Sequence, residues 1–320
     1  WQNLKQFAKW GIPTAQVVAY GLERHFRPGD ELLVSALEHH ANLLPWQQLA
    51  LRRGLVLRVL PLDERGVIDL EQARHIIGER TRLLAISQLS NVLGTWQPVV
   101  ELIQLARERG AWTLVDGAQG SVHGRHDLPG LGCDFYAFSG HKLYGPDGIG
   151  VLWGRPQALE QLAHWQFGGE MVRHTGFHEA SFHAAPLGFE AGTPAVSAAI
   201  GLGATIDWLA TLDEAEVAAH EGALHARLLA GLLARDGVSL LGEPQTALAS
   251  FCVDGVHVAD LAHLLGEQGI AVRAGHHCAM PLLQRLEVPG ALRVSLGLYN
   301  DADDLERFFL ALDRSLELLR

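Results

Sequence analysis

The sequence predicts an α/β fold with a mostly parallel central sheet flanked by helices, and a smaller C-terminal α+β domain. Apolar, strand-like runs alternate with helical patterns between residues 31 and 152, which is the order of a parallel sheet with crossover helices. Polar clusters directly follow several of these runs, where ligands bind in such sheets. We therefore expect a large domain over residues 1–205 and a small domain over 206–320.

The large domain is expected to begin without a strand, since residues 1–16 show no clear strand pattern. A short helix is predicted over 17–25, before a turn at 27–30. Strands are predicted over 31–35, 55–60, 83–87, 113–115, 133–138 and 148–152. Gly54 ends a helix over 44–53, and Pro98 begins a helix that Gly110 closes, as these residue types do at helix ends.

The remaining chain begins with an irregular, glycine- and histidine-rich segment over 166–193. Long helices over 195–209 and 213–235 follow it. The small domain is expected to contain strands over 247–253, 270–273 and 292–296 and a helix over 258–268. The last helix follows acidic Asp301, Asp303 and Asp304, and its apolar stripe is Leu305, Phe308, Phe309, Leu312, Leu316 and Leu319, a pattern typical of an amphipathic helix.

Composition excludes several classes of protein. The net charge of −11 argues against a nucleic-acid surface, and no apolar run reaches the roughly 18 residues of a membrane span. Cys133, Cys252 and Cys278 form no CxxC pair, which disfavours disulfides and structural zinc and suits a reducing cytoplasm. His174, His178 and His183 have no standard zinc spacing. We expect no metal.

Ser139-Gly140-His141-Lys142 follows the predicted strand over 133–138. A lysine at a strand end, beside a hydroxyl, a glycine and an imidazole, suits a carbonyl compound that can form an imine. The alternative is an ordinary surface lysine in a loop.

Asp116 ends another predicted strand. Its carboxylate could bind a metal, cap a helix or pair with a cationic ring nitrogen, and the lack of a second carboxylate nearby disfavours the metal. A lysine imine opposite a carboxylate that holds a pyridinium nitrogen protonated is the arrangement that pyridoxal phosphate needs. His39 and His40 follow a third strand; one could stack on a flat ring and carry protons, or the pair caps the next helix.

Ala274-Gly275-His276-His277-Cys278-Ala279 is the second informative cluster. Histidines and Arg273 favour the thiolate of Cys278, which is the reactive form of a cysteine. Arg293 could hold a substrate carboxylate in a bidentate pair or form an edge salt bridge. Core packing is expected for Cys133 and Cys252.

These motifs resemble the class V group of fold-type I pyridoxal phosphate enzymes, and within it the group II cysteine desulfurases (SufS/CsdA type). The resemblance runs from about residue 17 to residue 320. Its markers are Glu38-His39-His40-Ala41-Asn42, Ser90-Asn91-Val92-Leu93-Gly94, Val115-Asp116-Gly117-Ala118-Gln119, Ser139-Gly140-His141-Lys142-Leu143-Tyr144-Gly145-Pro146, Glu190-Ala191-Gly192-Thr193-Pro194 and Arg273-Ala274-Gly275-His276-His277-Cys278. The lysine motif marks the superfamily, and the His-His-Cys loop marks the desulfurase branch.

The resemblance implies a role for each motif. Lys142 would form the imine with pyridoxal phosphate and then carry protons, and Cys278 would attack the sulfur of L-cysteine, release alanine and carry a persulfide. Selenocysteine or cysteine sulfinate are related substrates. The remaining implied contacts are Asp116 to the ring nitrogen, Gln119 to the ring hydroxyl, His39 stacked on the ring, Ser139 and His141 on the phosphate, Thr193 on the phosphate of a partner subunit, and Asn91, Arg293 and the less clearly assigned Arg273 near the substrate carboxylate.

The resemblance also implies a homodimer, a sulfur-acceptor protein and a supply of sulfur such as iron–sulfur cluster assembly needs.

The sequence departs from the family pattern at the phosphate site. Family members carry a Gly-Thr-Thr turn where Trp10-Gly11-Ile12-Pro13-Thr14 stands here. In those proteins, an N-terminal segment of roughly 80 residues precedes this turn, and this sequence lacks it. Because Pro13 removes an N–H donor, weaker cofactor retention is expected. The alternatives are a truncated protein of this fold with little activity, or another class V aminotransferase or lyase.

Overall fold

The computed structural model describes residues 8–9 and 14–320, which group into two compact units. The first unit comprises Trp1–Pro61, Ile68–Gln88 and Pro98–Thr211. The second comprises Leu62–Val67, Leu89–Gln97 and Leu212–Arg320. The short segments Leu62–Val67 and Leu89–Gln97 thus belong to the same unit as the C-terminal part of the chain. The two-domain division after residue 205, which was predicted from the sequence, remains a prediction. Residues 10–13 of the divergent phosphate turn lie outside the described residues.

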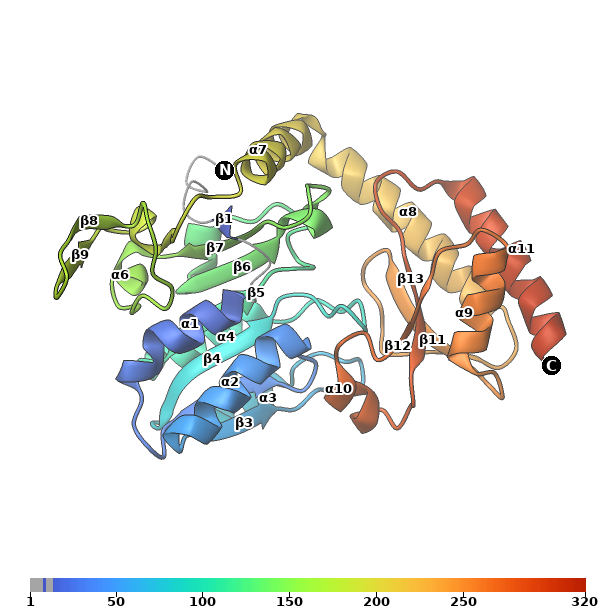
Figure 1. Cartoon of the computed structure of the whole chain (residues 1–320). Coiled ribbons are helices and arrows are strands. Elements are labelled where there is room, and N and C mark those ends of the chain that lie inside the picture. Colours follow the sequence, from blue (N-terminus) through green and yellow to red (C-terminus); the bar gives the residue numbers. More distant parts are fainter. Residues whose placement is uncertain (1–7, 10–13) are drawn as a thin grey trace. The chain divides into compact units, whose positions relative to one another are not determined.

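A seven-stranded sheet forms the centre of the first unit, in the order β1-β7-β6-β5-β4-β2-β3 (Figure 1). Its strands are β1 (Ala8–Lys9), β2 (Glu31–Ser35), β3 (Val56–Leu60), β4 (Thr81–Ser87), β5 (Trp112–Asp116), β6 (Phe135–Ser139) and β7 (Gly150–Gly154). The pairs from β3 to β6 are parallel, and β7 runs antiparallel to β6 and β1. This confirms the predicted mostly parallel sheet.

Burial explains why these apolar runs become strands. All five residues of β2 are buried, and Leu32 and Val34 share a core cluster with helices α1 (Thr14–Leu22) and α2 (His40–Arg53). Helix α4 (Val99–Glu108) buries Val99, Leu102, Ile103 and Ala106, which recur at the spacing of one helical face. Strands buried on both faces read as continuous apolar runs, as expected for the parallel part of a sheet.

The second unit contains a four-stranded antiparallel sheet in the order β10-β11-β13-β12. Its elements are α8 (Glu214–Leu233), β10 (Val238–Leu240), β11 (Leu248–Val253), α9 (Val258–Glu267), β12 (Arg273–Gly275), α10 (Met280–Arg285), β13 (Ala291–Ser295) and α11 (Ala302–Leu319). Helix α11 buries Leu305, Phe308, Leu312 and Leu316, and Asp301 and Asp304 form a capping box at its start. The predicted amphipathic last helix is confirmed.

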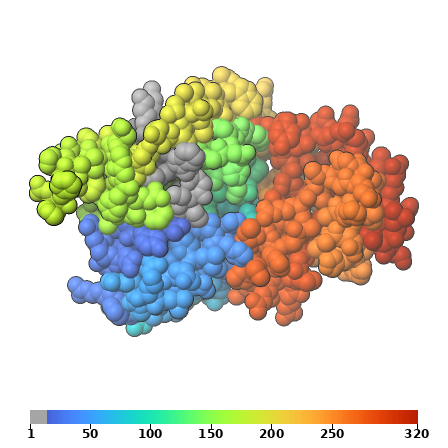
Figure 2. All heavy atoms as spheres, viewed as in Figure 1, coloured from blue at the N-terminus to red at the C-terminus, as the bar shows by residue number. Residues whose placement is uncertain are grey.

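Further elements complete the first unit. They are η1 (Glu23–His25), α3 (Leu70–Ile76), α5 (Leu128–Leu131), η2 (Gly140–Leu143), α6 (Pro156–Leu159), β8 (Val172–Thr175), β9 (Ala180–Phe182), η3 (Leu187–Phe189) and α7 (Val196–Thr211). The β8–β9 hairpin lies within the segment expected to be irregular, and its yellow-green atoms form part of the surface in Figure 2.

Three sequence predictions were wrong in position. Strand β1 lies where no strand was expected. Helix α2 begins at His40 rather than at residue 44, because the imidazole of His39 caps it. The strand predicted over 270–273 is displaced to β12, since the N–H of Ile270 donates to the carbonyl of Leu265 and so ends helix α9.

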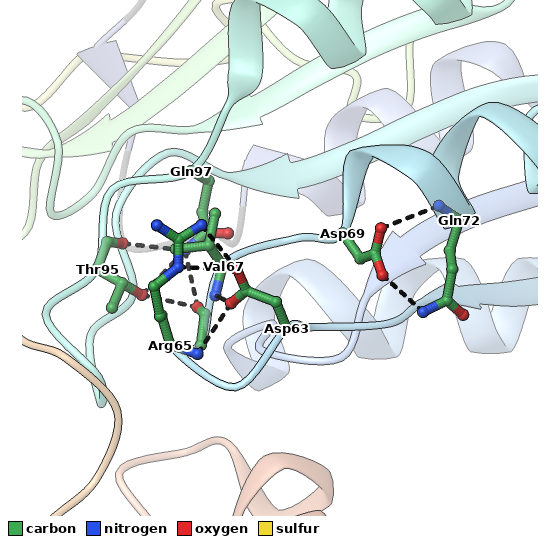
Figure 3. Close-up of polar contacts among 8 residues, drawn as sticks. Asp63, Arg65, Val67, Asp69, Gln72, Thr95 and Gln97 are labelled. Atoms are coloured by element: carbon green, nitrogen blue, oxygen red, sulfur yellow. Dashed lines mark hydrogen bonds and ion pairs between the residues drawn. The ribbon is translucent and has the colours of Figure 1, made fainter.

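Hydrogen bonds join the two short segments of the second unit to each other (Figure 3). The Asp63 carboxylate accepts from the N–H groups of Arg65 and Val67 at 3.0 and 2.9 Å. This turn presents the carbonyl of Gly66, which accepts from Thr95 Oγ1 at 2.9 Å and Gln97 Nε2 at 3.2 Å. Both donor side chains are buried. Separately, Asp69 caps helix α3 of the first unit through Gln72 (Figure 3).

None of the helices in the described part of the chain has the length and apolarity needed to cross a membrane.

Candidate active site

Lys142 lies on a closed turn at the end of β6. The N–H of Gly140 donates to the carbonyl of Ile149 at 2.9 Å, and the N–H of Gly145 donates to the carbonyl of Gly140 at 2.9 Å. A Cβ on Gly140 would lie 2.7 Å from Ile149 Cγ2, and one on Gly145 would lie 2.9 Å from the Gly140 oxygen. The turn therefore requires both glycines. Lys142 is half-buried and is the only lysine after Lys9 in the sequence.

Asp116 is the last residue of β5, the neighbour of β6, and pairs in register with Ala137. Its Oδ1 accepts from the N–H of Ala118 at 2.9 Å. Among the described residues, Oδ2 has no hydrogen-bond partner. A half-buried carboxylate with one oxygen fixed and one available can accept a hydrogen bond from a cationic ring nitrogen, as the sequence predicts.

Directly after Asp116, Gly117 lies against the ring of Tyr136. A Cβ on Gly117 would lie 1.9 Å from Cζ of that ring. Tyr136 is 1% exposed, and its hydroxyl donates to Gln88 Oε1 at 2.6 Å. Burial raises the pKa of Tyr136, so the phenol keeps the proton that it donates. Gly117 and the ring of Tyr136, next to Asp116 in the fold, are therefore closely packed.

We expect Gly117→Ala to lower the free energy of unfolding by about 1–3 kcal/mol, because the buried tyrosine must move to admit a methyl group. Asp116 should move with it, so cofactor affinity should fall as well. Thermal unfolding and cofactor titration measure the two effects. Gly203→Ala is the matched control: it lies in α7 with nothing within 4 Å of its added Cβ. Equal losses in both variants would contradict the packing argument.

His39 is held by its own backbone turn. Nδ1 accepts from the N–H of Ala41 at 3.0 Å, and the ring caps helix α2. Nδ1 is therefore the unprotonated nitrogen and Nε2 carries the proton. The ring is half-buried and has a fixed orientation, as a residue that stacks on a planar cofactor requires.

Glu38 is a buried carboxylate that joins two strand ends. One oxygen accepts from the Ser35 hydroxyl and from the N–H of Ser87 at 3.0 Å. The other accepts from Asn42 Nδ2 at 2.7 Å and Ser87 Oγ at 2.6 Å. Burial raises the pKa of Glu38 to about 7, although these donors oppose the shift. Glu38 thus links β2, β4 and α2 next to His39.

The remaining predicted cofactor residues belong to the first unit. Ser139 ends β6 and is half-buried, and His141 lies exposed in the same turn as Lys142. Gln119 is half-buried in the turn after β5. Thr193 lies exposed in the segment before α7. The parallel strands therefore bring Asp116, Ser139 and Lys142 to one sheet edge, while Thr193 comes from a separate segment.

Cys278 lies in the second unit, on the loop after β12. Arg273 Nη2 donates a hydrogen bond to its sulfur at 3.4 Å. Cys278 is half-buried, and no disulfide engages it. Cys252 is also half-buried, and its thiol donates to the carbonyl of Gly290 at 3.4 Å. Cys133 is fully buried in the first unit.

Arg293 is directly opposite Arg273 across the antiparallel β12–β13 pair. Its Nη1 donates to the carbonyl of Asn91 at 2.9 Å, and its buried Nε has no hydrogen-bond partner among the described residues. Burial and the neighbouring Arg273 lower the pKa of Arg293 to about 10, so the guanidinium remains charged at neutral pH. A half-buried cation whose Nε–H has no partner among the described residues is well suited to bind an anion.

Asn91 makes a contact that the sequence did not predict. Its Nδ2 donates to the carbonyl of His277 at 2.8 Å, and the side chain is almost fully buried. An amide nitrogen carries two hydrogens, so one remains for the predicted substrate contact. Asn91 thereby joins the loop after β4 to the loop that carries Cys278.

The sequence did not predict the contacts that Glu38 and Ser87 make in the first unit, or those that His277 makes in the second. The signal for Glu38 was a charged residue directly after a buried strand, with Asn42 one helical turn later. Ser87 is the last residue of β4, and its link to Glu38 depends on strand register. His277 precedes Cys278 in the sequence, and it was expected only as a residue that favours the cysteine thiolate. Within residues 8–9 and 14–320, no group of three His, Cys, Asp or Glu side chains could hold a metal ion.

Known proteins with similar sequences and structures identify the family of this chain. A family model described as aminotransferase class-V matches residues 11–308. A probable cysteine desulfurase of Pseudomonas aeruginosa is 96% identical over 314 residues, which is 98% of this chain and 78% of that protein.

Two solved structures are informative. The cysteine desulfurase CsdA of Escherichia coli, in an S-sulfonic acid form, matches with a TM-score of 0.95 and 41% identity, over 98% of this chain and 79% of that one. A lysine variant of C-DES, with glycine covalently linked to its PLP cofactor, matches with a TM-score of 0.82 and 25% identity, over 95% and 79%.

Proposed function

Because this chain belongs to the class-V aminotransferase family, and within it to the cysteine desulfurases, we propose that it converts L-cysteine to L-alanine and carries the sulfur as a persulfide on Cys278. The observation that carries this proposal is the placement of the Cys278 sulfur 3.4 Å from Arg273 Nη2, on the loop after β12, whose neighbouring strand β13 carries the half-buried Arg293. Selenocysteine and cysteine sulfinate are the related substrates that the same site would accept.

The residues at the sheet edge of the first unit fit pyridoxal phosphate. Asp116 keeps one carboxylate oxygen without a partner among the described residues, as a ring nitrogen requires. Lys142 supplies the amine, His39 supplies a ring of fixed orientation, and Gln119 would bond the ring hydroxyl. Ser139 and His141 would hold the phosphate. When bound, pyridoxal phosphate would accept the electrons released at the α-carbon of the substrate.

The chain's own residues perform the remaining chemistry. Lys142 Nζ would remove the α-proton of the substrate and hold it, and His39 would act in the proton transfers that follow. The Cys278 thiolate would attack the substrate sulfur, so that an S–S bond forms as the C–S bond breaks. The electron pair of the broken bond remains with the substrate carbon, which then takes up one proton to become the methyl group of alanine, and Lys142 Nζ would return the α-proton to the α-carbon.

Arg293 would bind the substrate carboxylate through its unpaired Nε, and the second N–H of Asn91 would contribute a further hydrogen bond. Arg273, which lies opposite Arg293 in the sheet, would hold the Cys278 sulfur in place through its hydrogen bond. A carboxylate close to both guanidinium groups would also reduce the repulsion between them.

The wider setting of the reaction follows from the resemblance. We infer a homodimer in which Thr193 reaches the phosphate of the partner subunit, and its exposure is consistent with such a role. A persulfide must be passed on, so a sulfur-acceptor protein is required, and iron–sulfur cluster assembly is the process we propose for it. Three sparse cysteines support a reducing cytoplasm.

The test is product formation by two cysteine variants. With pyridoxal phosphate, L-cysteine and a thiol reductant, the unmodified chain should form alanine and sulfide in equal amounts. Cys278→Ala should lose sulfide release, because the Cys278 thiolate is the proposed nucleophile. It should keep the cofactor absorbance. Cys252→Ala, a half-buried cysteine in the same unit, should keep both. Unchanged sulfide release by Cys278→Ala would exclude Cys278 as the nucleophile.

A further inference from the structure

The reactive cysteine lies in a conformation that its residue type rarely adopts. His277 and Cys278 both have left-handed backbone angles, with φ values of 52° and 59°. Side chains with a Cβ disfavour this region, and two such residues in succession need support from their surroundings. A hydrogen bond from the N–H of Ala279 to the carbonyl of His276, 2.9 Å long, closes the turn.

His277 supplies that support through two hydrogen bonds. Its Nε2 lies 3.0 Å from the carbonyl oxygen of Ala291, the first residue of β13. A carbonyl only accepts, so Nε2 carries the proton and Nδ1 is unprotonated. The carbonyl of His277 accepts from Asn91 at 2.8 Å. The residue that precedes the cysteine is therefore fixed at its side chain and at its backbone.

The surroundings of His277 keep its ring uncharged. The side chain is 2% exposed, and Nδ1 has no hydrogen-bond partner within the described part of the chain. The charged or titratable groups that face the ring are Arg293 on β13, Arg273 on β12 and the neighbouring His276. Burial and then Arg293 lower the pKa of His277 to about 4, against the opposing effect of the Ala291 carbonyl. A neutral, buried imidazole cannot act as an acid or base toward solvent.

We propose that His277 is a positioning residue for the sulfur-transfer step: its imidazole ties the Cys278 turn to β13 and so holds the sulfur beside Arg273. This inference rests on the proposed role of Cys278 as the nucleophile. His276 serves no such purpose, because its side chain is exposed. The adjacent histidines of the motif thus have different roles, and only the buried one determines where the thiolate lies.

Three variants test the assignment. His277→Leu keeps the volume of the ring and removes the donor to Ala291. His277→Gln places an amide N–H near the position of Nε2 and should restore the anchor. His276→Leu is the matched control. In His277→Leu, kcat for alanine formation should fall by on the order of 10²-fold, the typical effect of misplacing a reacting group by about 1 Å. KM and the cofactor absorbance should change little, and His277→Gln should recover most of kcat.

A second readout does not depend on activity. Hydrogen exchange at the Ala279 amide reports directly on the turn, because this N–H donates to His276. Exchange should accelerate at least about tenfold in His277→Leu, since this amide then opens without unfolding of the unit, and should be unchanged in His276→Leu. In the unmodified protein, nitrogen NMR should show a neutral Nε2–H tautomer of His277 at pH 6.

For each of these measurements, a specific result would contradict the proposal. Equal losses in His276→Leu and His277→Leu, or a kcat of His277→Leu close to that of the unmodified chain, would remove the positioning role. An Nδ1–H tautomer, or titration of His277 near pH 6.5, would do so without any variant. If the unmodified chain forms no alanine while Ala279 exchange still depends on His277, the proposed function fails and the structural anchor remains.

Discussion

Replacing Lys142 with alanine is expected to lower the rate of alanine formation from L-cysteine by at least about 10⁴-fold, because in the proposed mechanism this one side chain both bonds the cofactor and carries the proton. The turn itself should persist, since its backbone hydrogen bonds involve Gly140, Gly145 and Ile149 and not the lysine side chain. Steady-state assays give the rate. Borohydride reduction of the cofactor-loaded protein, followed by peptide mapping, shows where the cofactor is bonded.

Lys142→Arg is the matched control for charge. It keeps a cation in the turn but offers no amine that can bond an aldehyde, so it should be as inactive as Lys142→Ala. Activity of either variant within tenfold of the unmodified chain would exclude Lys142 as the proton carrier. A reduced cofactor adduct at another residue would exclude it as the attachment point.

Replacing Glu38 with leucine is expected to lower the free energy of unfolding by about 3–5 kcal/mol. The change leaves Ser35, Asn42 and both donors of Ser87 without their acceptor. Each buried donor that finds no other acceptor lowers the free energy of unfolding by about 1–3 kcal/mol. Denaturant titration measures the loss. Because His39 follows directly in the chain, cofactor binding should weaken as well.

Glu108→Leu serves as the control for Glu38→Leu, since Glu108 is exposed at the end of α4 and its change should alter stability by less than about 0.5 kcal/mol. A Glu38→Leu variant with the stability of the unmodified chain would show that the four hydrogen bonds contribute nothing net.

The stability that Glu38 contributes should depend on pH. Burial raises its pKa from 4.5 in the unfolded chain to about 7 in the fold, so the folded state keeps a proton that the unfolded chain has lost. This contribution is complete below pH 4.5 and is lost as the pH rises to 7. Relative to Glu38→Gln, which cannot titrate, the unmodified chain should lose about 3 kcal/mol across that range. A difference between the two proteins that is independent of pH would contradict the raised pKa.

The sheet and its functional edge could be predicted because both depend on local patterns. Continuous apolar runs such as Leu32 to Val34 indicate strands that are buried on both faces, and polar residues directly after them must lie at the carboxyl edge. Asp116 and Lys142 were located in this way. The family motifs then gave each residue a role that the sheet alone does not determine.

The features that were missed depend on non-local contacts. The link from Glu38 to Ser87 joins residues 49 positions apart, and the anchor from His277 to Ala291 depends on how β12 and β13 pair. Strand β12 itself was misplaced because the backbone of Ile270 is used to end a helix, and side-chain periodicity carries no information on that use.

The scarcity of lysine has a practical consequence for the chemistry of this chain. From residue 10 onward every strongly basic side chain except Lys142 is an arginine, and a guanidinium does not condense with aldehydes as an amine does. Added pyridoxal phosphate therefore meets few competing amines, and a spectroscopic titration should reach its end point near one equivalent per chain. The same scarcity makes Lys142 a distinctive target for aldehyde inhibitors, because the other lysines of this sequence are Lys5 and Lys9.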